Sequence, residues 1–81
     1  MTVVELTDDK RCTPVVLKIE EIQALKEDIN WINGRSYPFT LVFYGQKEYE
    51  HCVAVTESAK EIGRKIIKAL TDAGNDIAVN S

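Results

Sequence analysis

The chain has 81 residues, 44% of them hydrophobic and 28% charged, with a formal net charge of −3. A chain of this length forms one domain and buries only about 60% of its unfolded surface, so homo-oligomerisation would add stability that a single copy lacks. The acidic balance argues against nucleic acid as the main partner, and the chain has no run of about 20 apolar residues that could span a membrane.

The N-terminal part predicts a strand at residues 2–6, a turn at residues 7–10 and a second strand at residues 13–18. Pro14 stands near the start of the second strand and favours an edge or entry position, because proline cannot donate to a ladder. The charged turn interrupts the first apolar stretch, so we expect no signal peptide and a cytoplasmic protein.

The segment at residues 19–28 is ambiguous. Ile19, Ile22 and Leu25 fit helical spacing among good helix formers, which favours a short helix. The segment spans only about two and a half helical turns and has no clear cap, so a strand stays open as the alternative.

Asn33-Gly34 is the strongest turn signal in the chain, because both residues tolerate the positive φ angles of a type I′ turn. This turn would join a strand at residues 29–32 to residues 35–37, which lead into the central strand.

A second hairpin is predicted directly afterwards. Residues 39–44 and 49–55 are rich in aromatic and β-branched residues, which favours strands. A two-residue type II′ turn at Gly45-Gln46 would join them. That turn would place Phe39 opposite Cys52 and Thr40 opposite His51.

An amphipathic helix follows. Ser58 stands three residues before Glu61, which is the spacing of a capping box, and Thr56 is the competing cap. Gly63 lowers helix propensity, and a close approach of the backbone to the sheet would explain it. The helix shows one apolar face at helical spacing, formed by Ala59, Ile62, Ile66, Ala69, Leu70 and Ala73.

Gly74 is placed to end this helix. Residues 75–81 are then expected to form a flexible tail, with a terminal strand as the minority alternative. The chain therefore predicts a single α+β domain at residues 1–74. Its fold is an antiparallel β-sheet, a meander of about four to five short strands, packed by one C-terminal α-helix.

Five short runs carry a family resemblance: Val3-Val4-Glu5-Leu6-Thr7, Val15-Val16-Leu17, Ile19-Glu20-Glu21-Ile22, Thr40-Leu41-Val42-Phe43-Tyr44-Gly45, and Val53-Ala54-Val55-Thr56-Glu57-Ser58 leading into Glu61-Ile62. In this order they resemble the small FlbD flagellar-protein family, which runs short strands into a Val-x-Glu-Ser step and a terminal helix. The chain departs from that family in an insertion at residues 29–38, in a longer helix and in lacking Asn-Gly after Tyr44. The resemblance implies a small non-enzymatic domain and a strand at residues 19–27, and it transfers no functional residue.

The sequence shows no Gly-rich phosphate loop, no metal-ligand spacing and no nucleophile motif, so we expect neither an enzyme nor a cofactor. Cys12 and Cys52 are expected to be buried free thiols. His51 precedes Cys52 on a strand, so the two side chains should point to opposite faces rather than form a catalytic pair. The carboxylate pairs are expected to be solvated turn charges: Asp8-Asp9, Glu20-Glu21 and Glu27-Asp28.

Lys60, Arg64 and Lys68 recur every four residues and form a basic stripe along the helix. The simplest interpretation is a solvated face that is partly neutralised by Glu57 and Glu61. The alternative is a site for an anion or for an acidic partner.

Trp31, Arg35, Tyr37 and Phe39 surround the Asn33-Gly34 turn. Trp, Tyr and Arg most often anchor protein interfaces, and they also stack on planar ligands. The alternative is that Trp31 and Phe39 fill the core.

We therefore expect a small module that binds another protein, with a homodimer as an option. The small size alone, rather than any residue, suggests a regulator or inhibitor encoded by a phage or another mobile element. An alternative from a different class is a small-ligand or nucleotide site at a homo-oligomer interface. Its residues would be Arg35, Tyr37, Lys60, Arg64 and Lys68.

Overall fold

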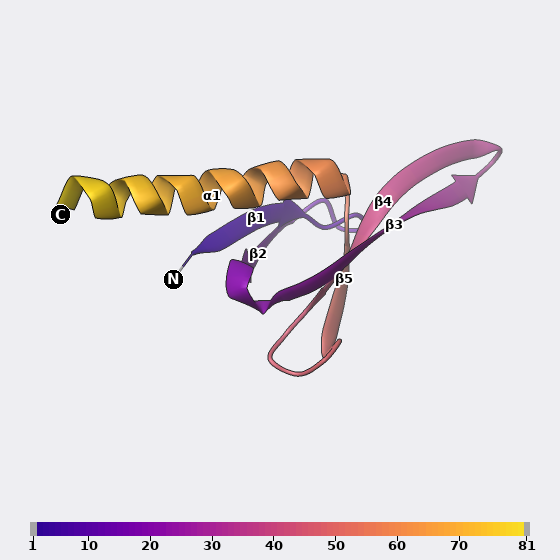
Figure 1. Ribbon diagram of the computed structural model, residues 1–81. Helices are drawn as coiled ribbons and strands as arrows, with labels where there is room; N and C mark the ends of the chain where they lie inside the picture. The colour runs from indigo at the N-terminus through magenta and orange to yellow at the C-terminus, as the bar shows by residue number, and fades with distance from the viewer. Residues whose placement is uncertain (1, 81) are drawn as a thin grey trace.

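The computed structural model describes residues 2–80, and it describes side chains up to residue 73. Within these residues the chain forms five strands in two antiparallel sheets and one C-terminal helix (Figure 1). The elements are β1 Val3–Thr7, β2 Pro14–Lys18, the short 3₁₀ turn η1 Ile19–Glu21, β3 Ile22–Ile32, β4 Arg35–Tyr44, β5 His51–Val55 and α1 Ala59–Asn80. The predicted α+β class is confirmed, although the strands divide between two sheets.

The first sheet is the hairpin of β1 and β2. Val4 pairs with Leu17 and Leu6 pairs with Val15, so alternate residues of both strands face the core. The connecting turn is closed by Asp8, whose Oδ1 accepts hydrogen bonds of 2.9 Å from the backbone N–H groups of Lys10 and Arg11. Both predicted N-terminal strands are confirmed.

The second sheet has the order β3-β4-β5, and it resolves the ambiguous segment. The short helix favoured by propensity is wrong, because a 3₁₀ turn covers only Ile19–Glu21 and the chain is extended from Ile22 onward. Ile22 and Leu25 pack against the core from this strand, and Leu25 pairs with Val42. Pairing and burial thus outweigh the helix propensity of the segment.

The predicted two-residue turn after Tyr44 is wrong. Tyr44 pairs with His51 and Phe43 with Cys52, so residues 45–50 connect the strands and the expected register is displaced. The side chain of Gln23 explains the longer connection. Its Nε2 donates to the carbonyl oxygens of Gly45 (3.2 Å) and residue 47 (2.6 Å), and its Oε1 accepts from the N–H of residue 49 (2.6 Å).

Helix α1 begins as predicted and ends later than predicted. The Oγ of Ser58 accepts a hydrogen bond of 3.1 Å from the Glu61 N–H, so Ser58 is the cap. The predicted end at Gly74 is wrong, since α1 continues to Asn80, and Ser81 lies outside the described residues. A single glycine costs a helix about 1 kcal/mol and is tolerated within a helical pattern.

The close approach expected at Gly63 is also wrong. A Cβ built at this position would meet nothing within 4 Å. Nothing in the structure explains a glycine there.

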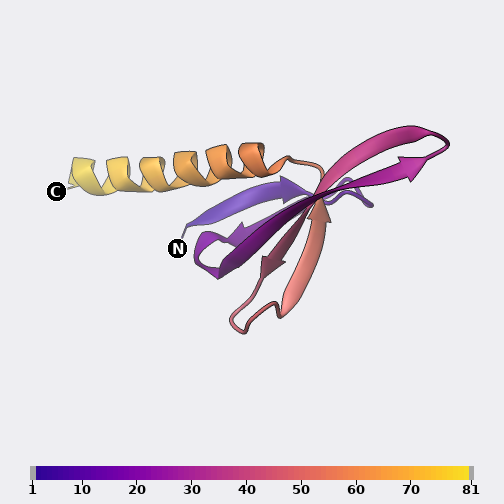
Figure 2. The ribbon, with the colours of Figure 1, turned by 45° about the vertical axis from the view of Figure 1, so that its right-hand side comes forward.

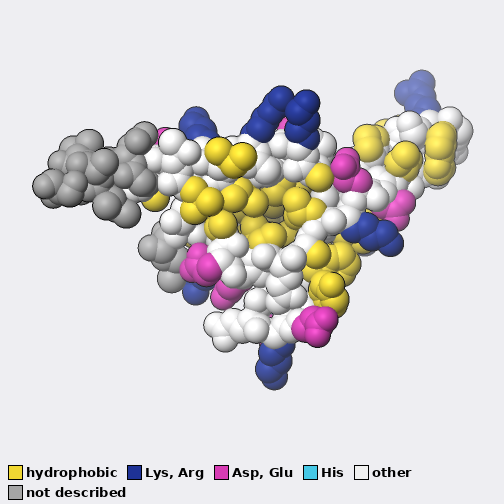
Figure 3. Space-filling model, viewed as in Figure 1, with side chains coloured by type: hydrophobic (Ala, Val, Ile, Leu, Met, Phe, Trp, Pro, Cys, Tyr) yellow, Lys and Arg dark blue, Asp and Glu magenta, His cyan; other side chains and the backbone are white. Residues whose placement is uncertain are grey.

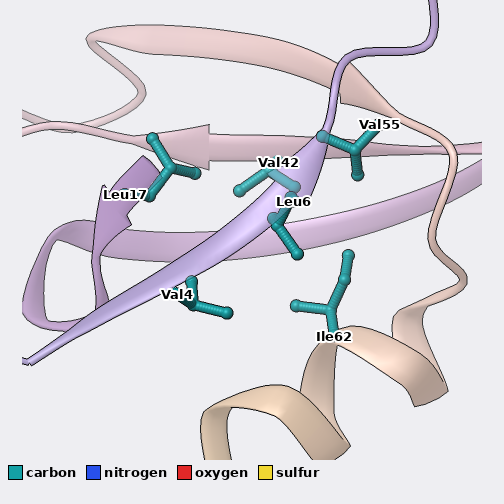
Figure 4. Close-up of a cluster of buried hydrophobic side chains, with 6 residues drawn as sticks. All are labelled: Val4, Leu6, Leu17, Val42, Val55 and Ile62. Atoms are coloured by element: carbon teal, nitrogen blue, oxygen red, sulfur yellow. The ribbon is translucent and has the colours of Figure 1, made fainter. Parts of the chain in front are cut away.

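The core lies where the two sheets and α1 meet. Figure 4 shows Ile62 of α1 pointing toward side chains of β1, with residues of β2, β4 and β5 around them. The buried apolar residues are Val4, Leu6, Leu17, Val42, Val55 and Ile62. A core this small makes each of these side chains a large share of the apolar burial.

The molecule is elongated, with extents of 55 × 26 × 19 Å and a radius of gyration of 14.5 Å. A compact chain of this length would have a radius of about 12 Å. The excess comes from two projections, because α1 extends from one end of the molecule and the β3–β4 hairpin from the other (Figures 1 and 2). Within the described residues, no helix is long and apolar enough to cross a membrane.

Candidate functional site

The outer half of the β3–β4 hairpin forms an arm, which we define as residues 29–38. Asn33 and Gly34 have φ angles of 51° and 77°, as a type I′ turn requires, so the predicted turn is confirmed. The ladder runs without a break from the pair Ile32 and Arg35 to the pair Ile29 and Pro38. This continuous pairing holds the arm as an extension of the sheet.

One face of the arm continues the core face of the sheet. Cross-strand partners share a face, and alternate residues along a strand return to it. Counting outward from the buried Val42 along β4 reaches Thr40 and then Pro38, while β3 contributes Ile29 and Trp31. We call the surface of Ile29, Trp31 and Pro38 the arm face.

The arm face is exposed in the single chain. Trp31 is 70% exposed and Ile29 is 49% exposed, so the idea that Trp31 fills the core is wrong. These side chains border an open hollow of about 470 Å³, which Glu27 and Asp28 also line. Figure 3 shows apolar side chains gathered along the arm at the right of the view.

The predicted aromatic cluster is divided between the two faces of the arm. Arg35, Tyr37 and the half-buried Phe39 lie in register on the face opposite Trp31, together with Ile32. Tyr37 is 47% exposed and Ile32 is 56% exposed. A single surface that contains all four predicted residues is therefore not formed.

The predicted basic stripe lies on the solvent side of α1. Lys60, Arg64 and Lys68 are exposed, and Figure 3 shows Lys and Arg side chains along the outer side of the helix. The flanking Lys65 has a different role, because its Nζ donates to the carbonyl oxygen of Glu5 (3.0 Å) and to Glu57 Oε2 (3.2 Å). Arg35 and the stripe occupy opposite projections of the molecule.

Glu57 is a buried structural residue that the sequence pattern does not indicate. The pattern predicts a charge that partly neutralises the basic stripe, but Glu57 is only 7% exposed. Its Oε1 accepts from the Thr7 N–H (2.9 Å) and its Oε2 from the Thr7 hydroxyl (3.0 Å). Its carbonyl oxygen accepts from the buried Thr40 hydroxyl (2.7 Å). With Lys65, these bonds tie β1, β4 and α1 together.

The hydrogen bonds also set the ionisation of Glu57. Burial raises the pKa of this carboxyl, but donation from the backbone of Thr7, from its own backbone N–H, from Lys65 and from the Thr7 hydroxyl outweighs burial. The net pKa therefore lies below the ordinary value of 4.5. The carboxylate is the form that the folded protein stabilises.

The remaining candidates do not form a chemical site. The prediction of buried thiols is wrong, since Cys12 and Cys52 are both exposed and free. His51 pairs with Tyr44 and Cys52 with Phe43, so the two residues belong to opposite faces of β5 as expected. Glu27 and Asp28 lie in β3 rather than in a turn. Among the described residues, no group of His, Cys, Asp and Glu side chains could hold a metal ion.

Comparisons of the chain with protein-family models, with curated proteins and with solved structures found no match. The geometry of the arm and of the helix is therefore what supports a function.

Proposed function

We propose that this protein is a non-enzymatic binding module that docks its arm face on another protein. The observation that carries the proposal is the 70% exposure of Trp31. This side chain lies on the same face of the sheet as Leu25 and Val42, which pack in the core farther from the turn. Burying a large aromatic side chain at an interface is a main source of binding free energy. The arm face thus presents residues of the type found in the core, and nothing among the described residues covers them.

The form of the arm supports a protein partner. A paired two-stranded ladder loses little conformational entropy on binding, because its backbone is already ordered. The hollow beside Trp31 and Ile29 is open, and Pro38, Glu27 and Asp28 are its other lining residues. A small-molecule pocket is usually enclosed and buries most of its ligand, whereas an open apolar surface suits a macromolecular partner.

No observation favours the ligand-binding alternative. Arg35 lies beside the arm turn and the Lys60–Arg64–Lys68 stripe lies on α1, at the other projection of the molecule (Figure 1). These groups do not converge within one chain, so the predicted ligand site at a homo-oligomer interface would need a second copy to complete it. A module that acts by occupying its partner fits a regulator or an inhibitor, and the exposed free thiols of Cys12 and Cys52 fit the reducing cytoplasm.

Replacing Trp31 with alanine is expected to abolish partner binding while the fold is kept. Truncating an anchor of this kind costs at least about 2 kcal/mol, or about 30-fold in affinity. The measurement is quantitative capture from an extract of the source cells with the wild type and with Trp31→Ala immobilised. A specific protein should be retained by the first and lost by the second.

Val16→Ala provides the matched control, because Val16 is 58% exposed on the outer face of β2, away from the arm. It should retain the same protein as the wild type. Equal retention by all three proteins, with circular dichroism unchanged, would contradict a role for the arm face.

A further inference from the structure

The exposed side of α1 has a mixed basic and apolar surface. Lys60, Arg64 and Ile67 follow one another at helical spacing on this side. Ile67 is 66% exposed, and Lys60 and Arg64 are also exposed. We call Lys60, Arg64 and Ile67 the helix face.

The arm face is complementary to the helix face in charge and in polarity. The arm offers the apolar side chains of Ile29, Trp31 and Pro38, and Glu27, two residues before Ile29, lies on the same face of β3 and lines the same hollow. The helix offers the apolar side chain of Ile67 beside two cations. Opposite charges that flank apolar patches favour association and fix its orientation.

The two faces also match in length. From Ile29 to Ile32 the free part of the arm advances by three residues, or roughly 10 Å at about 3.3 Å per residue. From Lys60 to Ile67 the helix face advances by seven residues, or about 10.5 Å at 1.5 Å per residue.

We propose that the arm face binds the helix face of a second copy of this chain. This inference rests on the proposed function and names the partner. The two faces cannot meet within one chain, because α1 and the arm extend in opposite directions from the body (Figures 1 and 2). Only two copies bring them together.

In the proposed dimer a twofold axis relates the two copies, each of which carries both faces. The arm of each copy lies on the helix of the other, so that the same contact occurs twice. A single contact between a two-stranded arm and one helix is small against the roughly 1,200–2,000 Å² that stable interfaces bury. Because the contact occurs twice, the buried area is doubled, and both the arm and the exposed side of α1 are covered.

Charge reversal tests whether these two faces are in contact, which the observation of a wild-type dimer alone does not show. The arm variant is Glu27→Lys, and the helix variant is Lys60→Glu with Arg64→Glu. Each variant opposes like charges in both contacts of its own dimer. In an equimolar mixture, the reversed arm meets the reversed helix and the native arm meets the native helix. Both contacts are then complementary again.

Sedimentation velocity should show a dimer for the wild type, a monomer for each variant alone and a dimer for the mixture. A monomeric wild type, a variant that dimerises alone, or a mixture that stays monomeric would each overturn the inference. If either charge-reversed variant fails to fold by circular dichroism, Trp31→Ala and Ile67→Lys replace the two variants. Each of these should be monomeric, and a dimer in either would overturn the inference.

Failure of this inference and failure of the proposed function give different results. A monomeric wild type that still captures a different protein through Trp31 would overturn the second copy as the partner and leave the arm face as the docking surface.

Discussion

Replacing Glu57 with alanine is expected to lower the free energy of unfolding by about 3 kcal/mol. The substitution leaves the Thr7 N–H and hydroxyl without their acceptors at a site where Glu57 is only 7% exposed. An unsatisfied polar group of this kind costs about 1–3 kcal/mol. For a chain of this length the whole stability is about 4–12 kcal/mol, so the loss is large. Urea unfolding followed by circular dichroism measures it.

Two further substitutions sharpen this test. Glu20→Ala removes an exposed carboxylate on η1 and should change stability by less than about 0.5 kcal/mol. Glu57→Gln keeps the size of the side chain and removes its charge. If Glu57→Ala matched Glu20→Ala, the network around Glu57 would not support the fold.

The same carboxylate gives stability a defined dependence on pH. Because the folded pKa of Glu57 lies below 4.5, its stabilising contribution is complete above that value. The contribution is lost as the pH falls through the folded pKa. The wild type should therefore lose more stability on acidification than Glu57→Gln, and parallel curves would show that another group causes the loss.

Leu6→Ala is expected to destabilise the protein by about 2–5 kcal/mol. Leu6 is fully buried at the centre of the cluster, where Val42 and Val55 of the second sheet and Ile62 of α1 surround it (Figure 4). The substitution removes apolar contacts and leaves a cavity that so small a core cannot easily close. Chemical denaturation measures the change in unfolding free energy.

Val16→Ala is the appropriate comparison, since it also shortens an aliphatic side chain of the first hairpin. Val16 is 58% exposed, so its loss should cost less than about 0.5 kcal/mol. Similar costs for the two substitutions would mean that the first hairpin is not packed on the second sheet as described.

Local chemistry accounts for the features that the sequence predicted. The Asn33-Gly34 turn and the Ser58 cap depend on residues that are adjacent in the chain, and both are present. The connection after Tyr44 could not be predicted in this way. It depends on Gln23, which lies on another strand more than twenty residues earlier. The buried position of Glu57 likewise depends on Thr7, fifty residues away along the chain.

The candidate site was predicted in part, for a similar reason. Residue types indicated the Trp31 turn region, and the arm does project there. The period of two along each strand then assigns Trp31 to one face and Arg35 and Tyr37 to the other. That division follows from the cross-strand register of β3 and β4, which Asn33-Gly34 sets. Applied to the whole cluster, this register separates Trp31 from Arg35, Tyr37 and Phe39.

The fluorescence of Trp31 tests the central claim most directly, because it is the only tryptophan in the sequence. At low concentration the emission maximum of the folded protein should lie close to that of the unfolded chain, and iodide should quench the fluorescence readily, since the side chain is 70% exposed. As concentration rises and the arm face is covered, the emission should shift to the blue and quenching should fall. Blue-shifted, protected emission at every dilution of a monomer would contradict an exposed arm face.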